Sequence, residues 1–249
     1  MTNYISADIR RVLHKPSFFY AVGVFVLLFA VLIFIYFNPA FTAEIYAAKV
    51  TSFFSFFPLL IGTLVFISVY ADDFKYRSMQ TAIGYGMSRS RIILAKLQES
   101  TILLLCATAV MEVLILGTPM LLGLAPNSQQ IITLALTAAT EMFRALGYIA
   151  LSAIPVFFFQ DAVGGIVVYV LLASKTIYIV LSMILGQGFF IHTMGDLTKY
   201  LYTAWLYLVR SAFIQGEPFM LSFLFALLLY VILPTIIAII GFHKKELEF

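Results

Sequence analysis

Six long apolar runs constrain this chain more than any other feature of its sequence. A membrane-spanning helix needs about 20 mostly apolar residues, because each helical residue rises ~1.5 Å. Only 11% of the 249 residues are charged and the mean hydropathy is +1.04, a composition that one soluble core could not bury. The sequence therefore predicts an all-α, polytopic membrane protein with a single transmembrane domain, 1–249. The predicted spans are 17–37, 50–71, 97–121, 129–158, 162–185 and 219–242.

The basic residues predict which way the chain lies across the membrane. Lysine and arginine concentrate on the cytoplasmic side of multi-pass proteins. Ten of the 15 basic residues fall before the first span, between the second and third spans, and after the last span. With six spans these three regions share one side, so we expect both termini in the cytoplasm. The same rule accounts for the net charge of +3, so the expected partner is the lipid bilayer and no nucleic acid.

Residues 1–16 are predicted to form a short amphipathic elbow helix at the cytoplasmic surface of the membrane. Ile5, Ile9 and Val12 fall on one face at helical spacing, and basic residues surround that face. Pro16 then permits a sharp turn into the first span. The alternative is a polar tail without regular structure.

Residues 186–217 are predicted to lie outside the cell, yet they are largely apolar. Asp196 is a candidate N-cap, and the apolar residues that follow it recur every three or four positions. Tryptophan and tyrosine prefer the membrane–water boundary, so we expect an interfacial helix on the outer leaflet. The alternative, a seventh span, would place the C-terminal lysines outside. The recurring residues are Leu197, Tyr200, Leu201, Ala204, Trp205 and Leu208.

The connection 72–96 is long and basic, and it is interrupted by Gly84 and Gly86. Ser88 is a candidate N-cap for a new helix that starts at Arg89. Its residues resemble the permease subunits of type-2 ABC exporters, and most of all the small bacterial permeases for antimicrobial or toxic peptides. The matching elements are Asp73-Phe74-Lys75-Tyr76, Gly86-Met87-Ser88-Arg89 and Lys96. The family usually has Glu where this chain has Asp73.

This resemblance implies that 72–96 couples the chain to a separate ATPase subunit, docking in a groove on its surface. It also implies two ATPase copies, a second permease copy (identical or related) and a bacterial plasma membrane. The alternative is a solvated basic loop produced by the positive-inside rule alone. The candidate coupling residues are Asp73, Lys75, Arg77, Gly86, Ser88, Arg89, Arg91 and Lys96.

The sequence contains no motif for catalysis by the chain itself. It has no Gly-x-x-x-x-Gly-Lys-Ser/Thr phosphate loop and no His-Glu-x-x-His zinc motif. We therefore expect no enzyme activity, no metal and no cofactor in this chain, with ATP and magnesium held by the partner subunit.

Four ionisable residues fall deep inside predicted spans: Glu112, Glu141, Arg144 and Lys175. Charges there are costly and mark candidate functional sites. Glu141 and Arg144 are three residues apart and can pair, and we expect Glu112 to pair with Lys175 across neighbouring spans. This neutral layer would either hold the bundle together or line the substrate pathway.

Together these features predict an exporter permease that moves an amphipathic or hydrophobic peptide, such as a bacteriocin or peptide toxin. Two alternatives remain. One is a stand-alone ion-coupled carrier that uses Glu112 and Lys175 as a relay. The other is an ABC exporter of lipids or drugs.

Overall fold

The structure, a computed structural model, describes residues 2–73 and 78–244. This part of the chain is helical and contains no strand. Five helical segments are long and apolar enough to cross a membrane, as predicted for a multi-pass protein. They are Phe18–Tyr36, Ala43–Ala71, Arg89–Leu121, Ser128–Phe159 and Met220–Lys244.

Three of the segments are single long helices and two contain π-helical turns. The helices α2 (Pro16–Tyr36), α7 (Arg89–Leu121) and α8 (Ser128–Phe159) are continuous. The segment Ala43–Ala71 comprises α3 (Ala43–Phe54), η1 (Pro58–Gly62), α4 (Thr63–Phe66) and η2 (Ile67–Ala71). The last segment comprises α13 (Met220–Leu227), η4 (Leu228–Ile232) and α14 (Leu233–Lys244).

The fifth predicted span, 162–185, is not one straight helix. It divides into α9 (Ala162–Ala173) and α10 (Thr176–Leu185), which are bent by 60° relative to each other. Lys175, at the break, has a φ of 63°, a left-handed conformation that ends an α-helix. The segment therefore counts as a sixth span only if the bent pair crosses the membrane as one unit.

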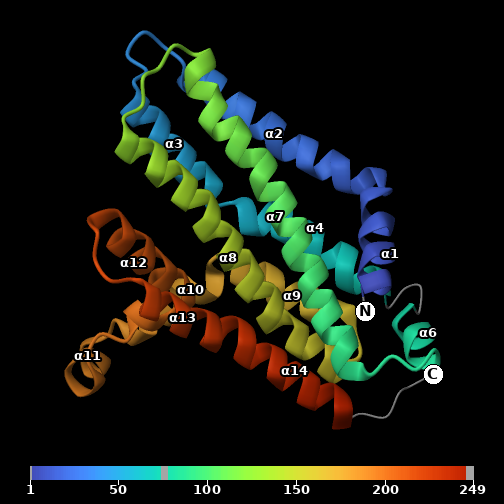
Figure 1. The fold of residues 1–249 in the computed structure, drawn as a ribbon. Helices are drawn as coiled ribbons and strands as arrows, with labels where there is room; N and C mark the ends of the chain where they lie inside the picture. The colour runs from blue at the N-terminus through green and yellow to red at the C-terminus, as the bar shows by residue number, and fades with distance from the viewer. Residues whose placement is uncertain (1, 74–77, 245–249) are drawn as a thin grey trace.

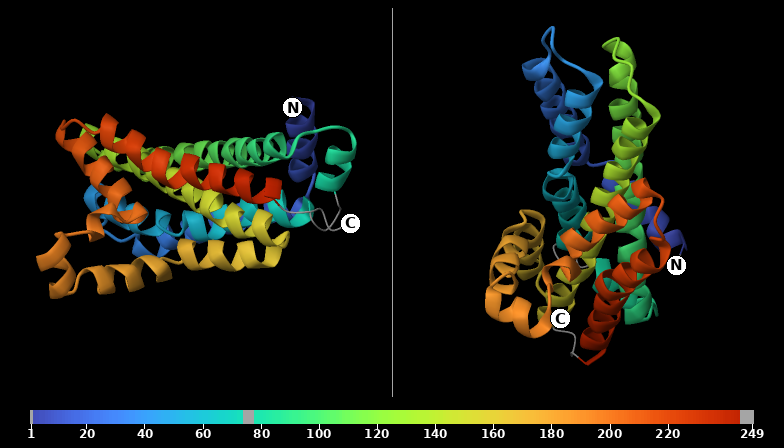
Figure 2. Two further views of the ribbon diagram at one scale, coloured as in Figure 1. Left: turned by 90° about the horizontal axis from the view of Figure 1, so that it is seen from below. Right: turned by 90° about the vertical axis from the view of Figure 1, so that its left-hand side faces the viewer.

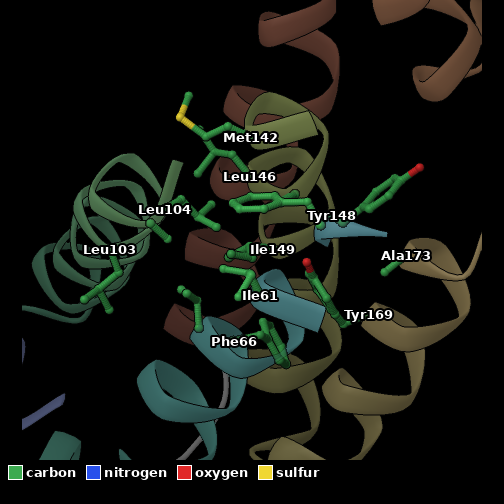
Figure 3. Packing of buried hydrophobic residues seen from close by; sticks show 14 of the residues in the cluster. Ile61, Phe66, Leu103, Leu104, Met142, Leu146, Tyr148, Ile149, Tyr169 and Ala173 are labelled. Carbon is green, nitrogen blue, oxygen red and sulfur yellow. The ribbon is translucent and has the colours of Figure 1, made fainter. Parts of the chain in front are cut away.

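Helix α8 is the centre of the bundle and packs against α7, α9, α12 and α14 (Figure 1). Its middle is rich in small residues, which let neighbouring helices approach closely. At Gly147, for example, an added Cβ would lie 2.3 Å from the ring of Tyr202. The surrounding core combines Leu104 of α7, Ile149 of α8, Phe66 of α4 and Tyr169 of α9 (Figure 3).

Helices α1 (Thr2–Leu13) and α6 (Ser78–Gly84) lie at one end of the bundle, where α7 begins and α14 ends (Figures 1 and 2). Helix α1 packs against α7 and α2. Its inward face is not purely apolar, because Asp8 is buried there beside Val12. This buried carboxylate belongs to a group of charges described below.

The predicted helix in 186–217 begins later than expected. The segment contains α11 (Gly188–Met194), the turn η3 (Thr198–Tyr200) and α12 (Tyr202–Gln215). Asp196 accepts hydrogen bonds from the amide and hydroxyl of Thr198, so it caps the short turn η3 and not α12. Helix α12 packs against α8 and buries Tyr202, Thr203 and Leu206.

Candidate functional site

Two groups of charges lie fully or partly buried in the molecule, and the first surrounds Tyr207 of α12. We call Glu141, Arg144, Lys175, Tyr207 and Arg210 the Tyr207 cluster. Arg144 Nη2 lies 2.8 Å from Glu141 Oε2, and Arg144 Nη1 donates to the Tyr207 hydroxyl at 2.6 Å. That hydroxyl donates in turn to Glu141 Oε1 at 2.9 Å. The three side chains form a closed ring, which confirms the contact between Glu141 and Arg144.

The Tyr207 cluster lies where two of the helical segments are interrupted. Helix α3 ends at Phe54, and the carbonyl of Ser55 just beyond it accepts a hydrogen bond from Arg144 Nη2 at 2.5 Å. Lys175 occupies the break between α9 and α10. Interrupted helices free backbone groups inside a membrane, and such breaks recur at transporter binding sites because the freed groups can meet a ligand.

Positive charge exceeds negative charge in the Tyr207 cluster. The Tyr207 ring centroid lies 5.2 Å from the guanidinium carbon of Arg210 and 5.9 Å from that of Arg144. Lys175 Nζ is also 5.9 Å from this centroid. Burial raises the pKa of Tyr207, and the Glu141 carboxylate raises it further, so the phenol stays neutral and adds no charge. Three cations thus face one carboxylate.

The predicted pairing of Glu112 with Lys175 is absent. Glu112 is partly exposed on α7, and its carboxylate makes no hydrogen bond or ion pair with any residue that the structure describes. The charges that act on Lys175 are those of Arg144 and Glu141. Helical spacing indicated that Glu112 and Lys175 have similar depths, but it carried no information about the direction in which each side chain points.

Sequence reasoning missed Tyr207 and Arg210, which the structure adds to this site. Arg210 was assigned to an external surface, yet its Nη1 donates to the Thr137 hydroxyl of α8 at 3.0 Å. Glu141, in the same cluster, lies 13 residues after the start of α8. At ~1.5 Å per residue, this places the cluster ~20 Å along the helix axis from that end of α8. A lone arginine in an otherwise apolar helix was the available signal, since such a charge usually faces a partner inside the protein.

The second group of buried charges joins α1 to the ends of two spans. We call Asp8, Arg11, Asp73, Lys96 and Glu99 the terminal ion network. Lys96 Nζ contacts the carboxylates of all three acids, at 2.5 Å for Asp73 and 3.2 Å for Glu99. Arg11 lies 2.9 Å from Asp73 and 3.2 Å from Asp8.

The centre of the terminal ion network is almost fully buried. The side chains of Asp73 and Lys96 are each 1% exposed. Burial lowers the pKa of Arg11, but Asp8 and Asp73 outweigh that effect and the net shift is upward. Arg11 is therefore charged at any physiological pH. The network fastens α1 to the start of α7 and to the end of the segment that precedes α6.

The predicted coupling residues have several different environments. Asp73 and Lys96 are buried in the terminal ion network, so neither can touch a partner directly. Arg89 Nη1 donates to the carbonyl of Phe242 at 2.6 Å, which ties the start of α7 to the end of α14. Arg91 is exposed, whereas Lys75 and Arg77 lie outside the described residues.

The backbone of the segment agrees with the predicted helix start. Helix α7 begins at Arg89, and Ser88 is at its N-cap position with extended backbone angles, although its side chain makes no capping hydrogen bond. Gly86 has a φ of 85°, a conformation that favours glycine. The residue between the two glycines, Tyr85, is 89% exposed.

Comparison of this chain with protein-family models, curated proteins and solved structures finds no match. Within the described residues, no group of three or more histidine, cysteine, aspartate or glutamate side chains is placed to hold a metal ion.

Proposed function

We propose that the chain is the transmembrane permease subunit of an ATP-driven exporter in a bacterial plasma membrane. It would act with a second permease copy, identical or related, and with two ATPase subunits. In this arrangement α1 is the elbow helix, the bent pair of α9 and α10 is the fifth of six spans, and both termini are cytoplasmic. The multi-pass helical architecture and the short helices at one end of the bundle support the proposal.

The observation that carries the proposal is the exposed tip of α6. Tyr85 projects there between two glycines, with 89% of its surface exposed. Exposed aromatic side chains are common anchors in protein interfaces. The tip lies on the connection between two spans, so a partner bound to it can transmit movement to both spans.

The tip is also fastened on both sides. Before α6, Asp73 is held by Lys96 and Arg11 of the terminal ion network. After α6, Arg89 is bonded to the backbone at the end of α14. A tip held by contacts on both sides can transmit movement of an ATPase subunit to the spans, whereas a solvated loop would absorb that movement.

The proposed cargo is an amphipathic or hydrophobic peptide, with lipids or drugs as the alternative. Apolar cavities favour a cargo of this character. One of about 150 Å³ lies between α8, α12 and α13 and is lined by Phe143, Phe213 and Phe223 among others. A stand-alone carrier with a relay from Glu112 to Lys175 is less favoured, because the structure does not bring these two residues together.

Co-purification tests the proposal. The full chain is expressed with the ABC ATPases of its own organism, and the captured complex is assayed for ATP hydrolysis. Tyr85→Ala is expected to lower the affinity for the ATPase about 30-fold or more, since anchor residues contribute ~2 kcal/mol or more. Tyr20→Ala is the matched control, because Tyr20 on α2 is also highly exposed, at 74%, but lies on a span.

Two results would contradict the proposal. One is ATP hydrolysis by the purified chain alone at the rate of a complex. The other is an ATPase that binds the Tyr85→Ala variant as well as the parent chain. Arg89→Glu is a poorer test, because Arg89 also bonds the end of α14 and its loss would disturb folding.

A further inference from the structure

The excess positive charge in the Tyr207 cluster calls for an anion. The terminal nitrogens of Arg144 contact Glu141, the Tyr207 hydroxyl and the Ser55 carbonyl. Its buried Nε has no hydrogen-bond partner among the described residues. The side chain of Lys175 is half-buried, and its ammonium makes no hydrogen bond or ion pair with any residue in the described part of the chain, apart from its contact with the Tyr207 ring. An uncompensated ammonium in a membrane protein is costly, so its retention at this place points to a ligand.

Lys175 lines a cavity that could hold such a ligand. The cavity has a volume of about 160 Å³ and lies between the break in the α3 segment and the break between α9 and α10. Its lining residues are Ser55, Phe56, Leu59, Ala173, Ser174 and Lys175. Lys175 is the cation among these lining residues; Arg144 lies behind the wall, bonded to the carbonyl of Ser55.

An apolar groove adjoins the cavity and shares Phe56 with it. The groove has a volume of about 340 Å³ and runs between α2 and the segment that follows α3. Leu28, Val31 and Ile35 form one side, and Phe53, Phe56 and Leu60 form the other. The cationic cavity and the apolar groove together match a molecule with one acidic group and one hydrocarbon chain.

We propose that this site binds the carboxylate of a single-chain amphiphile at Lys175, with its hydrocarbon chain in the groove between α2 and α3. A single chain is favoured over a two-chain phospholipid because, of the cavities named above, one apolar groove shares a lining residue with the cavity at Lys175. A carboxylate is small enough for the 160 Å³ cavity and accepts hydrogen bonds from a lysine ammonium. The proposal concerns binding alone and does not depend on ATP-driven export.

Equilibrium binding of three probes tests the site. The full chain is placed in nanodiscs of phosphatidylcholine, and saturable binding of dodecanoate, dodecanol and dodecyltrimethylammonium is measured by calorimetry. Dodecanoate is expected to bind saturably with one site per chain. Lys175→Met is expected to weaken that binding by about tenfold or more, as for a charge pair that loses one partner, and Lys175→Arg is expected to retain it.

Lys199→Met is the matched control. Lys199 is an exposed lysine on η3, and its loss changes the net charge equally, so dodecanoate binding should not change. Thermal unfolding of Lys175→Met without ligand should not fall below that of the parent chain, which separates lost binding from lost folding.

Three outcomes would overturn the proposal. Dodecanol that binds as tightly as dodecanoate would show that charge is not recognised. Unchanged dodecanoate binding in Lys175→Met would place the ligand elsewhere. Dodecanoate that is inert in nanodiscs of phosphatidylcholine, while added phosphatidylglycerol protects the chain through Lys175, would assign the site to a phospholipid instead.

Discussion

The terminal ion network and the Tyr207 cluster are both buried charge groups, but they differ in how completely their charges are paired. In the terminal ion network, each cation contacts at least two carboxylates. In the Tyr207 cluster, one carboxylate faces three cations, and Lys175 has no ionic partner within the described residues. Charges that are paired within the chain stabilise the structure, whereas a charge without an ionic partner is available to bind a ligand of opposite charge.

The largest expected effect is in the terminal ion network. Lys96→Met should destabilise the protein by about 3–5 kcal/mol, because it leaves three buried carboxylates without their shared cation. The measurement is thermal or denaturant unfolding of the chain in detergent, with Lys199→Met as the control for loss of a lysine. A loss below about 1 kcal/mol, the usual range for an exposed pair, would contradict a structural role for the network.

A smaller loss of stability is expected at the centre of the Tyr207 cluster. Tyr207→Phe keeps the ring but removes the hydroxyl that joins Arg144 to Glu141. Since hydrogen bonds to charged groups contribute about 1.5–3 kcal/mol each, we expect a loss near the lower end, because Arg144 and Glu141 still contact each other.

Tyr200→Phe is the control for this substitution. Tyr200 lies on η3 and half of its surface is exposed, so its variant should unfold as the parent chain does. Equal stabilities for the two variants would show that the Tyr207 hydroxyl does not hold the cluster together.

The smallest effect, and the one of opposite sign, is expected at Lys175. Without ligand, Lys175→Met should leave the unfolding temperature unchanged or raise it slightly, because an unpaired cation is removed from beside two others. The pairing predicted from sequence would instead make this variant unstable and let Glu112→Gln restore it. A double-mutant cycle of Lys175→Met and Glu112→Gln separates the two hypotheses. We expect the effects of the substitutions on the free energy of unfolding to add.

Much of the architecture follows from the sequence, because a bilayer accepts few solutions. Backbone groups in hydrocarbon must bond within the chain, so long apolar runs have to be helices, and their lengths can be read from the sequence. The start of α7 at Arg89 was predictable from the preference of serine for the N-cap position. The contact between Glu141 and Arg144 was predictable because it depends only on spacing along one helix.

Contacts between helices were decided only by the tertiary structure. Composition could not show that Lys175 breaks its helix or that α12 lies against α8, because both depend on how neighbouring segments pack. The partners of Lys96 come from positions 88 and 23 residues earlier in the chain, Asp8 and Asp73, and from Glu99 on its own helix. Periodicity gives the depth of a charge along a helix axis, but the direction of its side chain and the identity of its neighbour are set by packing of the whole bundle.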